Sequence, residues 1–211
     1  MELDRLHLFP HVLGLATGSA SGRWGARFQI LVLLACSLAH GPPLLAQTPA
    51  ASEYQVKAAI LFNLTKYVDW PAESFAETNS PIVIGILGQN SFGDDFKDMI
   101  EGKTINGRRL LLKRLIWGDD LNNLHVLFVS ASEKKRYPEI MEKLKNVSVL
   151  NVGESDSFTQ LGGMITLSTR DNKIRPQINL AAAERAHLKI SSKLLNISEI
   201  VTAKPRQRDD P

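Results

Sequence analysis

The sequence predicts an α/β fold: a three-layer α/β/α sandwich whose sheet is mostly parallel, with an antiparallel hairpin toward one edge. Two observations lead to this fold. Between residues 53 and 201, short apolar runs alternate with segments of helical periodicity, which is the pattern of a parallel sheet covered by helices on both faces. Near the end of this region, two strand-like runs flank a short turn, which predicts neighbouring antiparallel strands.

The first expected element is an amphipathic helix. Ser52 and Gln55 form a capping box, and apolar residues follow at helical spacing. Because Trp70-Pro71 cannot continue a helix, the helix is expected to end near Tyr67.

The middle of the chain predicts alternating strands and helices. The run Ile82–Leu87 is the clearest strand, because it is apolar throughout and is bounded by Pro81 and Gly88. The further elements expected here are a short helix over 94–100, strands over 109–116, 125–129 and 147–152, and a helix through Leu144 capped by Ser132.

The closing part predicts a hairpin and two helices. The runs Met164–Thr169 and Lys173–Ile178 flank Arg170-Asp171-Asn172, a typical turn sequence. The helices are expected from a cap at Asn179 through Ala186, and from a cap at Ser191 through Val201.

The N-terminal segment indicates export. Arg23 and Arg27 precede the apolar run Phe28–Ala39, and helix breakers follow at Gly41-Pro42-Pro43. A charged region, a short apolar region and a small residue at a plausible cleavage site are typical of a signal peptide. Because the apolar run is shorter than the ~20 residues of a membrane-spanning helix, cleavage after Ala46 and a periplasmic location are expected.

A second processing route stays open. Leu33-Leu34-Ala35-Cys36 is close to a lipoprotein signal, in which Cys36 would carry the lipid and become the new N-terminus. The soluble form is favoured, because Leu34 is bulkier than such signals usually carry and much apolar sequence follows Cys36.

The composition of the chain excludes several classes of function. Removing the first 46 of 211 residues leaves 165, enough for one ordinary domain. That part has no cysteine, so it holds no disulfide and no thiol chemistry. Its basic and acidic residues nearly balance, which argues against nucleic acid as a partner.

No catalytic, cofactor or metal motif is readable. Ser132 to Lys135 matches a serine–lysine acylation motif, but its partner motifs are imperfect and in the wrong order. His125 and His187 are the only histidines after Ala46, and no spacing pairs either with a nucleophile or forms a zinc motif. We therefore expect no enzyme, no cofactor and no metal.

Polar residues follow several of the expected strands, where open α/β sheets usually bind ligands. They are equally good turn residues, so a ligand site and a structural role both stay open here. The residues are Gln89, Asn90, Ser130, Ser132, Asn151 and Ser155.

Five segments, taken in order, carry a resemblance to a known family. They are Tyr67-Val68-Asp69-Trp70-Pro71, Ile84-Gly85-Ile86-Leu87-Gly88, His125 to Ser130, Phe158-x-x-x-Gly162-Gly163-Met164-Ile165, and Ile178 to Ala183 with Leu188 to Leu195. Together they resemble the YfiR-like family (DUF4154). The resemblance runs from about Glu53 to Val201, and its last segment is the most specific.

The resemblance implies a periplasmic α/β domain without catalytic activity. The founding member restrains a membrane diguanylate cyclase by binding its periplasmic part, which lowers cyclic-di-GMP, and an outer-membrane lipoprotein relieves that restraint. The corresponding expectation here is a periplasmic domain of a membrane signalling protein as partner, with a lipoprotein partner and a homodimer left open. The domain boundaries expected are a signal peptide over 1–46, a tether over 47–52, a YfiR-like domain over 53–201 and a polar tail over 202–211.

The chain departs from the family in two places. Relatives often carry a cysteine where this chain has His125, so the disulfides of the founding member are not expected here. Relatives usually carry an aromatic residue after Arg175, where this chain has Pro176, so that strand is expected to be an edge or bulged. A partner surface is expected around Arg175 and Asn179, although a solvated charge and a helix cap explain them equally well.

Two classes of function remain. The first is a regulator that binds the periplasmic part of a membrane diguanylate cyclase or sensor. The second is a periplasmic small-ligand-binding protein associated with an outer-membrane transport or sensor system, which the polar strand ends motivate.

Overall fold

The computed structural model describes residues 51–171 and 173–202. The expected signal peptide, the cleavage site after Ala46, Cys36 and nearly all of the polar tail lie outside these residues. The helices are α2 (Glu53–Lys66), η1 (Ala72–Ser74), α3 (Asp95–Ile100), η2 (Ala131–Arg136), α4 (Tyr137–Lys143), α5 (Ser157–Gln160), α6 (Leu180–Arg185) and α7 (Ser192–Leu195).

Ten strands are described in this part of the chain. They are β1 (Val68–Asp69), β2 (Ile82–Leu87), β3 (Thr104–Ile105), β4 (Arg108–Leu115), β5 (Val126–Val129), β6 (Leu150–Gly153), β7 (Ile165–Arg170), β8 (Lys173–Ile178), β9 (Lys189–Ile190) and β10 (Glu199–Ile200).

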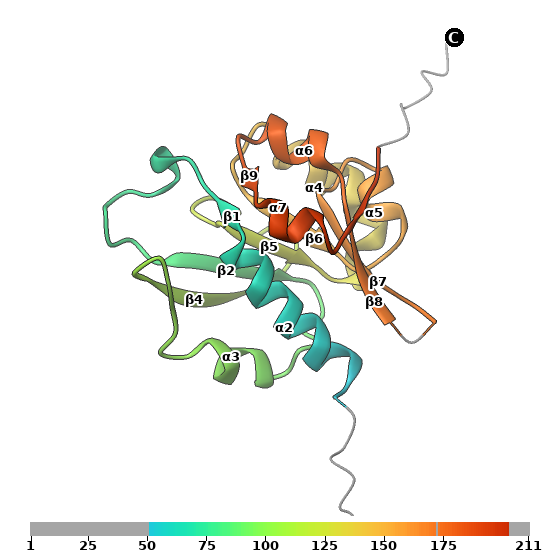
Figure 1. Ribbon diagram of the computed structural model, residues 1–211, viewed down its shortest axis with the longest axis horizontal. Coiled ribbons are helices and arrows are strands. Elements are labelled where there is room, and N and C mark those ends of the chain that lie inside the picture. The colour runs from blue at the N-terminus through green and yellow to red at the C-terminus, as the bar shows by residue number, and fades with distance from the viewer. Residues whose placement is uncertain (1–50, 172, 203–211) are drawn as a thin grey trace, which may run out of the picture. The chain divides into compact units, whose positions relative to one another are not determined.

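Eight of these strands form one sheet in the order β10-β8-β7-β6-β5-β2-β4-β3 (Figure 1). The five central strands, β4, β2, β5, β6 and β7, are parallel to one another. The hairpin β7–β8 is antiparallel and lies next to the edge strand β10. The predicted α/β fold, with a mostly parallel sheet and a late hairpin, is confirmed.

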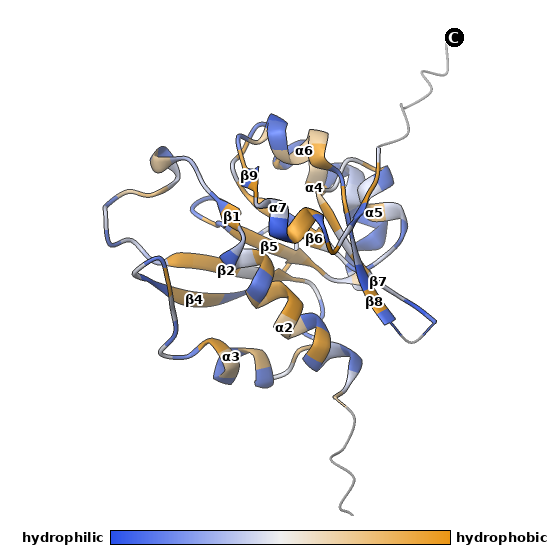
Figure 2. Ribbon diagram, in the orientation of Figure 1, coloured by the Kyte–Doolittle hydropathy of each residue, from blue (hydrophilic) through white to orange (hydrophobic). Residues whose placement is uncertain are grey.

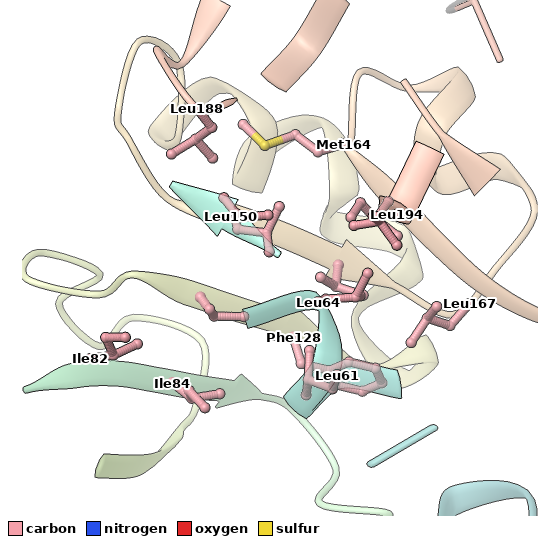
Figure 3. Close-up of a cluster of buried hydrophobic side chains, with 14 of the residues drawn as sticks. Leu61, Leu64, Ile82, Ile84, Phe128, Leu150, Met164, Leu167, Leu188 and Leu194 are labelled. Carbon is pink, nitrogen blue, oxygen red and sulfur yellow. The ribbon is translucent and has the colours of Figure 1, made fainter. Parts of the chain in front are cut away.

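Helices cover both faces of the sheet. On one face, Figure 3 shows Leu61 and Leu64 of α2 with Phe128 of β5 and Leu194 of α7, all within a single buried apolar cluster. The other face packs mainly against Tyr137 and the rest of α4. The apolar strands between the two helical layers stand out in Figure 2. The three-layer arrangement therefore follows from strands that are buried on both sides.

Two helix starts form as the sequence predicts. The Ser52 hydroxyl accepts a hydrogen bond from the Gln55 N–H at 3.2 Å, and the Gln55 side chain accepts one from the Ser52 N–H at 2.9 Å. At α6, the Asn179 side chain accepts a hydrogen bond from the Ala182 N–H at 3.1 Å. Each cap satisfies backbone donors that have no partner within the helix.

Three expected elements are wrong in their bounds. Ser132 does not cap the helix before Leu144: Ser130 caps η2, and α4 begins only at Tyr137. The strand expected over 147–152 is β6, which begins at Leu150. The helix expected from Ser191 through Val201 ends at Leu195, because Glu199 and Ile200 pair with β8 instead. In the last case, sheet pairing overrides helical periodicity.

A small second sheet joins the two ends of the domain. β1, directly after α2, pairs antiparallel with β9, so that Val68 lies opposite Ile190. The Tyr67 carbonyl also accepts a hydrogen bond from the Ser191 N–H at 2.9 Å. Segments more than 100 residues apart in sequence are thereby fixed to each other.

Pro176 lies where β8 has only one paired neighbour. It is opposite Leu167 of β7, and β10 pairs with β8 only at Gln177 and Ile178. A proline is tolerated at such a position because the missing N–H deprives no second strand of a donor. The strand is therefore an edge at Pro176, as the sequence predicts.

Candidate functional site

The sheet has a topological switch point at the carboxyl ends of β2 and β5. From β2 the chain first adds β4 on one side and then β5 on the other. In open α/β sheets, the crevice at such a point is the usual ligand site. The loops that begin at Gly88 and Ser130 meet there.

A carboxylate from the neighbouring strand fills this point. Glu154, the residue after β6, accepts hydrogen bonds from the Ala131 N–H at 2.7 Å and the Lys57 ammonium at 2.8 Å. The Tyr54 hydroxyl donates to it at 3.0 Å and the Ser130 hydroxyl at 3.4 Å. One carboxylate thus ties α2 to the ends of β5 and β6.

Lys57 is buried together with this carboxylate. The side chains of Lys57 and Glu154 are each 4% exposed, and Lys57 also contacts Glu53 at 2.7 Å. Burial lowers the pKa of Lys57, but hydrogen bonds and attraction from Glu154 and Glu53 outweigh it and leave the pKa raised. The hydrogen bond from Lys57 holds the pKa of Glu53 below its usual value. Lys57 is therefore a permanent cation in this cluster.

The rest of the switch point is closely packed. A Cβ at Gly88, whose φ is +90°, would lie 2.5 Å from the Ser132 hydroxyl and 2.7 Å from a Glu133 carbon. The Gln89 N–H donates to the Ser132 hydroxyl at 3.0 Å. These polar groups satisfy one another, so the geometry favours a structural role over a ligand site.

The other polar residues singled out in the sequence are dispersed. Asn90 donates to the Gly93 carbonyl at 3.0 Å within its own loop. Asn151, the second residue of β6, accepts from the Met164 N–H at 2.8 Å. Asn179 is buried and also donates to the Thr159 carbonyl at 3.4 Å, so it does not share a surface with the exposed Arg175.

No sequence motif marks the two residues that organise the switch point. Lys57 and Glu154 are 97 positions apart, and each has the ordinary appearance of an exposed charge. A shift of the expected strand 147–152 to its actual end at Gly153 would have placed Glu154 at the carboxyl edge. Strand bounds, rather than a motif, were the missing signal.

Arg175 lies on a different surface, at the β8 edge. It is exposed and opposite Ser168 in the β7–β8 hairpin. A pocket of about 310 Å³ opens beside it. The pocket is lined by Ser168, Arg170, Asp171, Lys173, Arg175, Gln177 and Glu199.

The charges of this pocket are only partly neutralised. Arg170 pairs with Asp156 at 3.2 Å, and Glu199 accepts a hydrogen bond from Gln177 at 2.9 Å. Within residues 51–171 and 173–202, Lys173 and Arg175 take part in no ion pair. The lining also contains the carboxylates of Asp171 and Glu199, so the pocket offers two cations beside two acidic groups to a polar partner.

Comparison with known proteins places this chain in a family. Residues 54–199 match the YfiR/HmsC-like family (DUF4154). The chain belongs to that family. No curated protein matches it significantly. Membership suggests a periplasmic regulator of cyclic-di-GMP signalling, and it agrees with the resemblance seen in the sequence.

The structure explains two of the sequence elements on which the resemblance to the YfiR-like family rests. Trp70 of the Trp-Pro element donates its indole N–H to the His125 carbonyl at 3.0 Å, which locks β1 against the central strand β5. Phe158 of the Phe-x-x-x-Gly-Gly element is fully buried, and a Cβ at Gly163 would come within 2.3 Å of its ring. The second glycine is thus required by the ring of the phenylalanine.

His125, the residue before β5, lies in an aromatic stack. Its ring stacks on Phe75 with 4.5 Å between the ring centroids, and the Arg108 guanidinium lies over the Phe75 ring, 3.6 Å from its centroid. Nδ1 accepts a hydrogen bond from the Val83 N–H at 3.1 Å. Nε2 is buried without a hydrogen-bond partner in the described part of the chain.

The surroundings of His125 keep its ring neutral. Burial lowers the pKa of His125 below its usual 6.5, the Ser74 backbone acts in the opposite direction, and the Arg108 charge lowers it again. The unfolded chain therefore binds a proton that the folded ring excludes.

Acidification should consequently destabilise the protein. As the pH falls below about 6.5, the free energy of unfolding should drop by up to about 1.4 kcal/mol per pH unit from this residue. The measurement is urea unfolding between about pH 7.5 and about pH 5, a range that brackets the usual histidine pKa. His125→Gln should flatten the dependence, and His187→Gln, at an exposed histidine, should retain it. Equal slopes for wild type and His125→Gln would contradict the assignment.

Membrane spans and metal clusters are the features that two other classes of function would need. Among residues 51–171 and 173–202, none of the helices has the length and apolar character of a membrane span. The same residues bring no three His, Cys, Asp or Glu side chains together in a group that could hold a metal ion.

Proposed function

We propose that the protein is a periplasmic regulator that binds the periplasmic part of a membrane diguanylate cyclase or sensor and thereby lowers cyclic-di-GMP. Membership of the YfiR/HmsC-like family is the observation that carries this proposal. The proposal includes export, with residues 1–46 removed as a signal peptide, a tether up to Ser52, and the polar tail from Thr202. An outer-membrane lipoprotein that relieves the restraint, and a homodimer, are compatible with it.

The contact surface that we propose is the β8 edge around Arg175. Arg175 and Lys173 supply two exposed cations beside a polar pocket, as described above. Ile200, next to Glu199 of that pocket, is 52% exposed and gives the same edge an apolar contact. Arginine beside apolar surface is favoured at interface hot spots, because it donates several directed hydrogen bonds on a partly apolar stem.

Asn179 supports this surface indirectly. Its buried side chain caps α6 and thereby fixes the chain where it leaves β8. A change at Asn179 is expected to act through stability, whereas a change at Arg175 is expected to act on binding alone.

Charge reversal at Arg175 tests the surface. Arg175→Glu should weaken partner binding by at least about 30-fold, the equivalent of a hot-spot loss of ~2 kcal/mol. Expressed in a deletion strain, this variant should leave cyclic-di-GMP at the raised level of the deletion, while the wild-type gene lowers it. Cyclic-di-GMP in cell extracts is the quantity to measure, with the amount of protein in the envelope checked by immunoblot.

Lys135→Glu provides the matched control. Lys135 is an exposed cation on η2, away from the β8 edge, and should complement as the wild type does. If deletion raises cyclic-di-GMP and Arg175→Glu complements fully, the regulatory role stands and the contact surface is wrong. If deletion leaves cyclic-di-GMP unchanged in a strain that expresses the protein, the regulatory role itself is wrong.

A further inference from the structure

The opposite edge of the sheet carries a second surface, independent of the proposed function. β4 has eight residues, but β3 pairs only with Arg108 and Arg109. Over Leu110–Leu115, no strand in the described part of the chain pairs with β4 on the side away from β2. Figure 1 shows this strand at the border of the sheet, beside α3.

The backbone along this edge is able to accept another strand. The Leu115 carbonyl accepts a hydrogen bond from the Gly88 N–H at 3.0 Å, so Leu115 turns its backbone groups toward β2. In a strand paired to a parallel neighbour, alternate residues turn both groups to the same side. Leu110, Leu112 and Arg114 therefore direct their N–H and C=O groups outward, in contrast to the β8 edge, where Pro176 has no N–H to offer.

A groove runs along the same edge. It has a volume of about 970 Å³ and lies between β4 and the segment around α3. Leu111 in its wall is 50% exposed, and Ile116 just beyond the strand is 71% exposed. A long edge strand with exposed apolar side chains is the kind of edge that pairs with another chain.

The charges of the groove favour an acidic occupant. Arg114 is neutralised by Asp94 at 2.7 Å. Of the remaining charged residues in the lining, Lys97, Lys103 and Arg109 are basic and Glu101 is acidic. Lys103 also lies over the Phe62 ring at 5.2 Å. A second copy of this chain is a poor occupant, because pairing two β4 edges would bring the same basic side chains together.

We propose that the outer edge of β4 binds an extended segment of another protein, in which acidic residues alternate with apolar ones, as an added strand. Backbone hydrogen bonds to Leu110, Leu112 and Arg114 would hold the segment. Alternate side chains of an added strand face opposite sides of the sheet. The acidic ones would meet the basic groups of the groove, and the apolar ones would cover Leu111.

Amide hydrogen exchange with a defined peptide tests the proposal. The full chain is expressed with ¹⁵N label and purified from the envelope fraction, and the probe is an octapeptide of alternating glutamate and valine. Exchange of the Leu110, Leu112 and Arg114 amides should be fast in the free protein and should slow at least ~10-fold with the peptide, as newly bonded amides do. The amides of Leu111 and Lys113, which face β2, should be protected in both states.

The controls separate a specific strand pairing from other causes. An octapeptide of alternating lysine and valine should give no slowing. Lys97→Glu combined with Lys103→Glu, which reverses two basic groups of the groove, should abolish the effect of the glutamate peptide, and Lys135→Glu should retain it. Arg114→Pro should also abolish it while the protein stays folded, because it removes an outward N–H and an exposed side chain.

Each of the other outcomes overturns the proposal. Equal slowing by both peptides would mean nonspecific association. An absence of slowing would mean that the edge does not pair. Protection of the three outward amides in the free protein would mean that this chain, or a second copy of it, already covers the edge.

Discussion

Replacing Glu154 by leucine should lower the free energy of unfolding by about 3–5 kcal/mol. The change leaves Lys57 buried, with Glu53 as its remaining carboxylate partner. It also removes the acceptor of the Tyr54 hydroxyl and the Ala131 N–H. Urea unfolding followed by circular dichroism measures the loss.

The double variant Lys57→Met with Glu154→Leu should recover part of this stability, because two apolar side chains of similar size leave no charge unpaired. Glu142→Leu is the control. Glu142 pairs with Lys145 at 3.3 Å on the surface, where an ion pair contributes less than about 1 kcal/mol. If Glu154→Leu is no more costly than Glu142→Leu, the buried cluster is not the structural centre described here.

Phe158→Ala should lower the free energy of unfolding by a similar amount, about 3–5 kcal/mol, because it leaves a cavity between the sheet and α4. The ring is fully buried and meets Tyr137 edge-on at 4.9 Å. A Cβ at Gly153 would lie 2.4 Å from the Phe158 ring. Gly153→Ala should therefore destabilise the protein by about 1–3 kcal/mol through overpacking.

A double-mutant cycle checks this cause. In the Phe158→Ala background, Gly153→Ala should lower the free energy of unfolding by less than about 1 kcal/mol, because the ring that the new methyl group would overlap is absent. Gly163→Ala should still lower the free energy of unfolding in that background, though by less, since its Cβ would also lie 2.8 Å from the Phe158 carbonyl oxygen. Additive effects of Gly153→Ala and Phe158→Ala would show that the two residues do not compete for the same space.

Local sequence patterns were sufficient to predict most of the fold. The apolar run Ile82–Leu87, the capping box at Ser52 and the hairpin around Asp171 each depend on neighbouring residues, and each forms as predicted. The prediction that the last helix continues through Val201 was wrong. The residues around Glu199 have a helical pattern, but Glu199 pairs with Gln177, 22 positions earlier. A sequence pattern cannot weigh a helix against a strand partner that lies elsewhere in the chain.

The candidate sites were less accessible to sequence reasoning. Ser130 and Asn151 were singled out because polar residues follow strands, yet their hydrogen bonds are internal. The buried pairing of Lys57 with Glu154 depends on how α2 crosses the sheet, which no local pattern encodes. Arg175 is predicted as a contact because it lies beside Pro176, where the chain departs from the family pattern, whereas its exposure beside a polar pocket is a property of the folded edge.

Site-specific crosslinking beside Arg175 in living cells is the most direct test of the proposed role. A photoreactive phenylalanine analogue replaces Ile200, which is 52% exposed on the same edge, so that Arg175 itself stays in place. A second strain carries the analogue at Lys135 as control. We predict a crosslinked adduct from position 200 alone, identified by mass spectrometry as a membrane protein with a diguanylate cyclase output domain. Equal adducts from both positions, or the absence of that membrane protein from the position 200 adduct, would contradict the proposed role.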